Sequence, residues 1–173
     1  MIKKVLIATD GSEHATKAVE FGSDIAARYD AEVVLVHVLL RHELPDDMKR
    51  MAAVEHLTRQ APLPSAAVPA VDLANIINMR GAIPAVSDEA LGAVGERVLE
   101  HAEEIARDRG VDTVVKRIED GKPVDRILAV AKAENVDLIV SGARGLSDLE
   151  ALLVGSVSHK LAHLAPVTCL TVR

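Results

Sequence analysis

The chain has 173 residues, 49% of them apolar and 27% charged, which predicts one globular domain with a sizeable core. A net charge of −6 argues against binding to nucleic acid, which needs clustered Lys and Arg. No run of about 18 apolar residues is present to span a membrane. The single cysteine, Cys169, rules out an internal disulfide and is consistent with a cytoplasmic location.

The first elements are predicted to be two strands joined by a helix. Residues 3–10 form a short β-branched apolar run, which predicts a strand ending at Asp10. Ser12 is a suitable N-cap for the helix that follows, in which apolar residues recur at helical spacing. Residues 31–40 are apolar on both faces, which predicts a second strand in the interior of the sheet.

Residues 41–86 differ in character, because they are rich in proline and methionine and have loose periodicity. The stretches 46–60 and 66–80 are each compatible with a helix. We interpret 41–86 as an insertion, between the second strand and the second regular helix, in a single domain spanning 1–173. Its apolar content predicts a lid over a nearby site, a surface for a protein partner or a static flap, and not a solvated linker.

The pattern of helices and strands resumes after the insertion. Ser87 is the expected N-cap of a long helix that ends at Gly110. Residues 112–121 predict a third strand, placed nearer an edge because its polarity is mixed. Pro123 suits the first turn of a helix that continues to about Asn135.

Two further strands enclose the last helix. Residues 136–143 predict the fourth strand, Ser156 is the expected cap of the last helix, and Pro166 marks where that helix has ended. Residues 166–173 predict the fifth strand. The alternation predicts an α/β fold with an open, doubly wound, five-stranded parallel sheet, Rossmann-like, with helices on both faces and strand order 3-2-1-4-5.

Two glycine-bearing loops mark the expected ligand site. In doubly wound sheets a ligand binds at the carboxyl ends of the strands, where the winding reverses. The loops available there follow the first and fourth strands and read "TDGS" and "SGARG". Their position predicts a binding site without reference to any motif.

The second loop continues as G-x-x-G-x9-G-S, formed by Gly142, Gly145, Gly155 and Ser156. Glycine lets a phosphate approach the main chain closely, and the first N–H groups of a helix attract anions. This spacing therefore favours a nucleotide phosphate site. An alternative stays open, in which the first two glycines form a tight turn and the third only begins a helix.

The histidines carry weaker signals. His159 and His163 have the spacing of a two-histidine metal site, but no third ligand accompanies them. Leu161 and Leu164 are expected on the buried side of the same helix, which leaves both histidines in solvent. His37 is expected to pack as a strand residue.

The chain resembles the universal stress protein family in "VLIATDGSEHATKAVEFG", in "VVLVHV" and in "DLIVSGARGLSDLEALLVGSVSHKLAHLAPVTCLTVR". The resemblance covers the chain outside 41–86, and its glycine motif is that of the members that bind ATP. It implies that Asp10 contacts ribose or a phosphate-bound Mg²⁺, and that the main chain of Val38 meets adenine. It also implies that ribose and phosphates, of ATP or of ADP or AMP, are held by the motif residues Gly142, Gly145, Gly155 and Ser156, flanked by Ala8, Thr9, Ser141, Arg144, Val157 and Ser158.

A local role competes with the nucleotide for Asp10, because an acid before glycine can also cap its own turn. The resemblance further implies a homodimer formed through the last strand, from Val167 to Val172, whose apolar edge needs a cover. We expect an ATP-binding regulatory or signalling protein of the stress response. The alternatives are a slow ATP hydrolase or an adenylyl or phosphoryl transferase, for which no base is evident, and a partner-binding protein with a vestigial nucleotide site.

Overall fold

The computed structural model describes residues 1–39, 88–145 and 155–173. The insertion, the helices expected within it and its predicted role as a lid or partner surface lie outside these residues. The same is true of Ser87, the expected cap of the second regular helix.

Five parallel strands form one sheet in the order β3-β2-β1-β4-β5, which confirms the predicted topology. Each strand lies inside its expected range and is shorter at both ends. Their bounds are Lys4–Ala8 for β1, Glu32–Leu39 for β2, Val114–Asp120 for β3, Leu138–Gly142 for β4 and Thr168–Val172 for β5.

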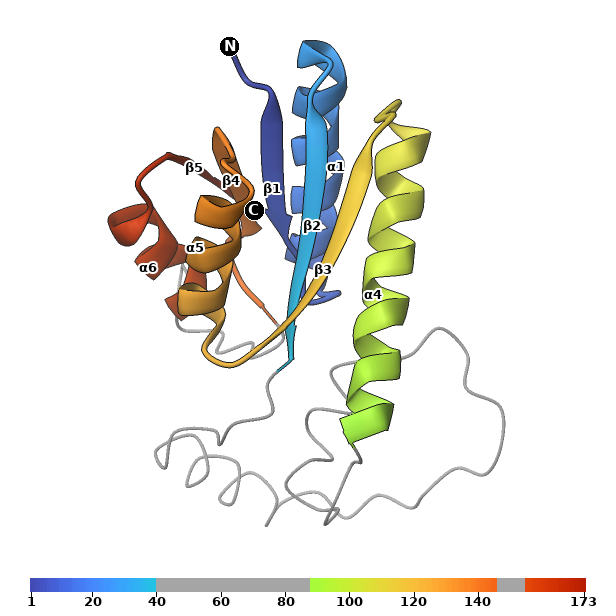
Figure 1. The fold of residues 1–173 in the computed structure, drawn as a ribbon, viewed down its shortest axis with the longest axis vertical. Helices are drawn as coiled ribbons and strands as arrows, with labels where there is room; N and C mark the ends of the chain where they lie inside the picture. The colour runs from blue at the N-terminus through green and yellow to red at the C-terminus, as the bar shows by residue number, and fades with distance from the viewer. Residues whose placement is uncertain (40–87, 146–154) are drawn as a thin grey trace.

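Helices cover both faces of the sheet, so the doubly wound arrangement is confirmed (Figure 1). On one face α1 and α4 pack against the strands, and on the other face α5 and α6 do so. Their bounds are Glu13–Tyr29 for α1, Asp88–Asp108 for α4, Pro123–Ala133 for α5 and Ser156–Leu164 for α6.

Most helix ends follow the local signals in the sequence. The Ser12 hydroxyl accepts the N–H of Ala15 at 3.3 Å, which confirms its role as the cap of α1. Gly110 follows α4 with a φ of +85°, a left-handed conformation that glycine adopts without steric cost. Pro123 occupies the first turn of α5, where its missing N–H costs nothing.

The prediction that Ser156 is the N-cap of α6 is wrong. Gly155 is the N-cap, with φ −67° and ψ 157°, and Ser156 is already helical; no side chain caps this end. The reason is tertiary, because a β-carbon on Gly155 would lie 3.1 Å from the carbonyl oxygen of Ala143. Close packing of the two loops therefore takes precedence over side-chain capping here.

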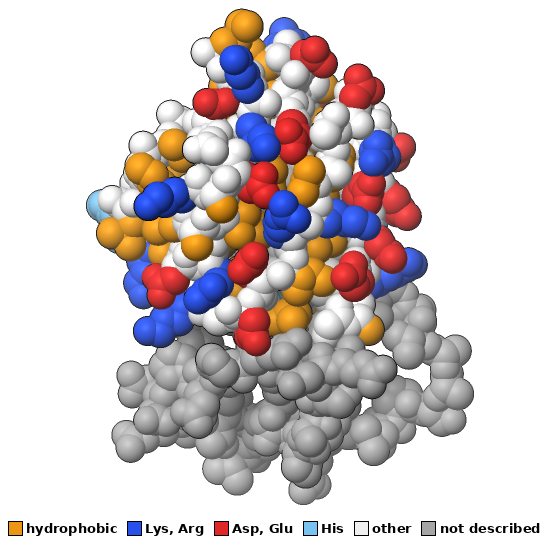
Figure 2. Space-filling view, in the orientation of Figure 1, with side chains coloured by type: hydrophobic (Ala, Val, Ile, Leu, Met, Phe, Trp, Pro, Cys, Tyr) orange, Lys and Arg blue, Asp and Glu red, His pale blue; other side chains and the backbone are white. Residues whose placement is uncertain are grey.

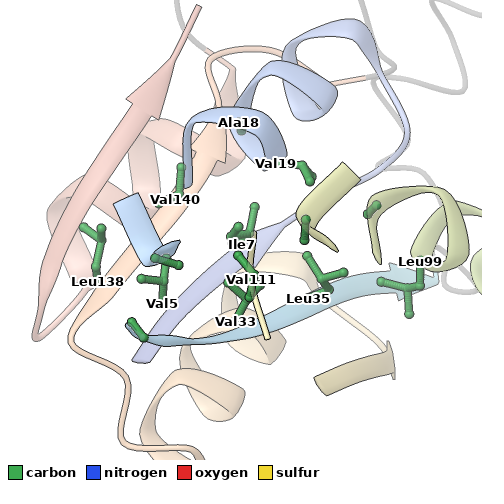
Figure 3. Close-up of a cluster of buried hydrophobic side chains, with 14 residues drawn as sticks. Val5, Ile7, Ala18, Val19, Val33, Leu35, Leu99, Val111, Leu138 and Val140 are labelled. Atoms are coloured by element: carbon green, nitrogen blue, oxygen red, sulfur yellow. The ribbon is translucent and has the colours of Figure 1, made fainter. Parts of the chain in front are cut away.

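The core is aliphatic, as the near absence of aromatic residues predicts. Alternate strand residues point to opposite faces and form two clusters. Figure 3 shows the cluster beneath α1 and α4, where strand residues such as Ile7, Leu35 and Val140 meet Val19 and Leu99. Each such fully buried side chain contributes about 1.5–3 kcal/mol relative to an exposed one.

The surface mixes both charges and a few apolar side chains. Figure 2 shows basic and acidic side chains interspersed over one face of the described residues. Phe21 and Tyr29, on α1, are 51% and 48% exposed. Leu164, the last residue of α6, is 60% exposed, so the prediction that it faces the core is wrong. Leu161 of the same helix is buried, one turn earlier. None of the helices in the described ranges has the length and apolar character of a membrane span.

Candidate functional site

The two glycine-bearing loops meet at the carboxyl ends of β1 and β4. These strands are neighbours, with Ala8 paired to Ser141, and the winding of the sheet reverses between them. A β-carbon on Gly145 would lie 2.5 Å from Oδ2 of Asp10, so the loops are in close contact. The structure thus brings together the residues that the sequence placed at the ends of separate strands.

Asp10 is held in a defined turn after β1. Its Oδ1 accepts the N–H of Ser12 at 3.0 Å, and Oγ1 of Thr9 accepts the N–H of Gly11 at 3.3 Å. Asp10 therefore does cap its own turn, the role that competes with nucleotide binding in the sequence analysis. The other carboxylate oxygen is directed at the position where Gly145 would carry a side chain, at the junction of the two loops.

Gly142 has a packing role. A β-carbon there would lie 2.8 Å from the carbonyl carbon of His14 and 2.9 Å from the main-chain nitrogen of Ala15. Both are backbone atoms in the first turn of α1, which cannot move aside as a side chain can. The start of α1 therefore lies directly against the end of β4, and glycine is needed there whether or not a ligand binds.

The carbonyl of Ala143 joins the two halves of the glycine motif. It accepts the N–H of Gly155 at 2.6 Å and lies 3.1 Å from the Ser158 hydroxyl, a buried donor. The Gly155 N–H, one of the donors expected for phosphate, is therefore used within the protein. The first N–H groups of α6, at Ser156 and Val157, have no partner within the helix. Helix-end N–H groups of this kind can bind an anion.

The start of α6 suits an anion. Its first turn has no acidic residue and no capping side chain, so the positive end of the helix dipole is not neutralised from within the helix. Arg144 is half-buried in the preceding loop, close to the same end.

Val38 lies beyond the end of β1, because Ala8 at the end of that strand pairs with Val36 of β2. Both Val38 and Ala8 are half-buried and pack on the face covered by α5 and α6. Both therefore present apolar side chains on the same face of the sheet near the carboxyl ends of β1 and β2, and Ala8 is two residues before Asp10.

His37 is packed within β2, as expected, but it also contacts the main chain beside the candidate site, which the sequence analysis did not foresee. It is 8% exposed, and its Nδ1 lies 2.9 Å from the main-chain oxygen of Thr9, directly before Asp10. The sequence signal for this contact was a histidine within an otherwise apolar, buried strand, since a buried polar group needs a hydrogen-bond partner.

The pKa of His37 lies below its ordinary value of 6.5, because burial disfavours the charged imidazolium. The Thr9 carbonyl and the Asp10 carboxylate act in the opposite direction but do not compensate. The unfolded chain therefore takes up this proton at a higher pH than the folded chain does. The stability from neutral His37 is fully present above pH 6.5 and is lost as the pH falls toward the folded-state pKa.

We expect the free energy of unfolding of the wild type to fall more than that of His37→Asn between pH of about 7.5 and about 5.5. Urea denaturation at the two pH values measures both decreases. Ion pairs lower the carboxyl pKa of Glu103 and Glu134 from 4.5, so these groups act at lower pH and do not obscure the comparison. Equal decreases in the two proteins would contradict the expectation.

Other features of the described residues lie apart from this site. A hollow of about 300 Å³ lies near the amino ends of β1, β2 and β3, away from the candidate site. It is lined by residues such as Lys3, Asp30 and Thr113. His159 and His163 are exposed, as expected, with ring centroids 4.6 Å apart. Within the described ranges no three His, Cys, Asp or Glu side chains are grouped closely enough to hold a metal ion.

The fold is that of a Rossmann-like α/β protein, and its paired loops form a candidate site at the switch point of the sheet. The model of the universal stress protein family matches residues 1–173, and the chain belongs to that family.

Curated relatives match along almost the whole chain. Universal stress protein YxiE of Bacillus subtilis is 30% identical over 175 residues, covering 100% of both chains. A protein of Staphylococcus aureus strain USA300 with the same family name is 30% identical over 172 residues, covering 99% of this chain and 84% of its own length.

Solved structures share the fold. Universal stress protein UspA from Lactobacillus plantarum has a TM-score of 0.69 at 19% identity, covering 99% of this chain and 98% of that one. A universal stress protein in complex with cAMP has a TM-score of 0.63 at 24% identity, covering 99% and 97%. The universal stress protein from Archaeoglobus fulgidus in complex with dAMP has a TM-score of 0.59 at 18% identity, covering 100% and 98%.

Proposed function

We propose that this protein binds an adenine nucleotide, ATP or its products ADP or AMP, and acts as a regulatory or signalling module in the stress response. The observation that carries the proposal is the meeting of the Asp10 turn with the uncapped start of α6 at the switch point. The complexes of family members with cAMP and with dAMP support an adenine nucleotide as the ligand.

Each part of the site suits one part of the nucleotide. The apolar side chains of Ala8 and Val38 suit adenine, with the main chain of Val38 bonding to the base. The Asp10 carboxylate suits a ribose hydroxyl, because an ionised carboxylate only accepts hydrogen bonds. The first N–H groups of α6 suit the phosphates. The remaining proposed contacts come from residues flanking these loops, namely Thr9, Ser141, Gly142, Arg144, Gly145, Gly155, Ser156, Val157 and Ser158.

Magnesium fits this site only together with the phosphates. Asp10 provides a single carboxylate, and Mg²⁺ is commonly held by one or two carboxylates plus phosphate oxygens and water. When bound, the ion would neutralise phosphate charge. Among the described residues, Asp10 is the one we propose as a protein ligand.

Two measurements test nucleotide binding. Mass spectrometry of the molecules released from freshly purified, denatured protein should detect an adenine nucleotide. Calorimetry should give a micromolar dissociation constant for ATP, about −8 kcal/mol. No adenine nucleotide in the extract, together with no heat of binding for ATP, AMP or cAMP at millimolar concentration, would reject the proposal.

We further propose that two copies pair through β5, from Val167 to Val172. This strand is an edge of the sheet, and each of its residues is at least partly exposed. The carbonyl of Val172 accepts the N–H of Ala143, the residue after β4, at 2.6 Å. Because main-chain groups alternate in direction along a strand, those of Cys169 and Thr171 point away from the sheet. A second copy offering the same strand would satisfy them.

Thr171→Pro is expected to convert the dimer to a monomer, because proline removes an outward N–H from the edge strand. Thr171→Val keeps that N–H and should remain dimeric. Sedimentation velocity at micromolar concentration compares the two variants with the wild type. A monomeric wild type, with or without ATP, would rule out pairing through β5.

A further inference from the structure

We propose that His37 is a positioning residue for the nucleotide site, which orients Asp10 by holding the peptide that precedes it. The inference rests on the proposed function, and it assigns a role to a side chain that does not itself face the ligand. It is carried by two contacts of the imidazole ring, one with the main chain after β1 and one with α4.

The first contact continues the bonding between β1 and β2 beyond their last paired residues, through the side chain of His37. The last paired residues of these strands are Ala8 and Val36, and the N–H of Thr9 still donates to the carbonyl of Val36 at 2.9 Å. The carbonyl of Thr9 then lies 2.9 Å from Nδ1 of His37. Because a carbonyl oxygen only accepts, Nδ1 must carry the hydrogen. Both polar groups of the Thr9 backbone are therefore held by β2.

The second contact places α4 close to the ring. A β-carbon on Gly95 of α4 would lie 3.1 Å from Cδ2 of His37 and 3.1 Å from Cδ2 of Leu39. The helix therefore passes close over the ring at a residue that has no side chain. The imidazole is enclosed between α4 and the Thr9 carbonyl, which explains why it is only 8% exposed.

The carbonyl of Thr9 and the nitrogen of Asp10 belong to the same planar peptide group. A bond that fixes this carbonyl therefore fixes the direction in which the Asp10 backbone leaves β1. Ser12 then holds one carboxylate oxygen, at 3.0 Å, and the other oxygen is directed to Gly145. Without the bond from His37 the peptide can rotate, and Asp10 is no longer held ready for the nucleotide.

Three variants separate the bond from the bulk of the ring. His37→Asn places an amide nitrogen near the position of Nδ1 and can still donate to Thr9. His37→Gln places its amide near Nε2, and His37→Leu fills the space without any donor. We expect ATP affinity, measured by calorimetry, to fall roughly tenfold in the Leu and Gln variants and about twofold in the Asn variant, as for the loss of one hydrogen bond.

A double-mutant cycle with Asp10→Asn shows whether His37 acts through Asp10. We expect His37→Gln to lower ATP affinity in the wild-type background and to have little further effect beside Asp10→Asn. An equal loss in both backgrounds would indicate general loosening of the fold and would overturn the inference. So would an Asn variant as weak as the Leu variant.

The same variants distinguish a failure of the role proposed for His37 from a failure of the proposed nucleotide binding. If the wild type binds ATP and Asp10→Asn weakens binding while His37→Leu and His37→Gln do not, only the role of His37 fails. If the wild type does not bind ATP, AMP or cAMP, the proposed function fails and the inference with it.

Discussion

Replacing Ser156 by proline is expected to weaken ATP binding roughly ten- to hundredfold, the usual effect of losing a hydrogen bond to a charged group. Ser156 is the first residue of α6, so its N–H has no acceptor within the helix and is available to a phosphate. Proline removes this donor and places its ring where the phosphate would approach. Isothermal calorimetry with ATP measures the change.

The substitution suits the local backbone, so the helix should form as before. Proline is favoured at the first helical position, and it prefers an extended residue before it. Gly155 has that conformation, with φ −67° and ψ 157°. By comparison, any substitution of Gly155 itself is hard to interpret, because a β-carbon there would press on Ala143 even without a ligand.

Ser156→Ala is the matched control, since it removes the exposed hydroxyl and keeps the N–H. We expect it to weaken binding by about threefold, as for a single neutral contact. The difference between the proline and alanine variants then reports the main-chain donor. Equal affinities in these two variants would show that the start of α6 does not bind the phosphates through its backbone.

Gly142→Ala is expected to destabilise the fold by about 3 kcal/mol, at the upper end of the usual cost of overpacking. The new methyl group would lie 2.8–2.9 Å from backbone atoms of His14 and Ala15, and it can be accommodated only by moving the start of α1 away from β4. Urea denaturation monitored by circular dichroism measures the loss of free energy.

Gly92→Ala provides the same chemical change in open space. Outside the backbone of its own helix, no atom of the described residues lies within 4 Å of a β-carbon at Gly92 in α4. Alanine in a helix is more stable than glycine by about 0.5–1 kcal/mol. We therefore expect a small gain of stability there. A Gly142→Ala variant as stable as the wild type would show that α1 and β4 are less closely packed than the structure indicates.

Local patterns were sufficient to predict the strands, most helix ends and the fold. The apolar runs at 3–10 and 31–40 predicted buried strands because a parallel sheet covered on both faces requires them. Ser12 and Pro123 act through neighbours within one helical turn, so their roles could be inferred from sequence alone. The glycine spacing and the rule for doubly wound sheets placed the candidate site at the ends of β1 and β4, where the two loops meet.

Contacts between distant segments decided what each glycine and polar side chain does. Gly142 packs against α1, and Gly155 donates its N–H to the carbonyl of Ala143. His37 of β2 bonds to the carbonyl of Thr9, which follows the neighbouring strand β1. The partners in these contacts are 12 to about 128 residues apart, so no local pattern could reveal them. The amino-acid sequence by itself determined the order of elements and the edge at which a ligand would bind. Only the tertiary structure decided which donors there are already bonded within the protein, because hydrogen bonding and packing between loops depend on how the strands align.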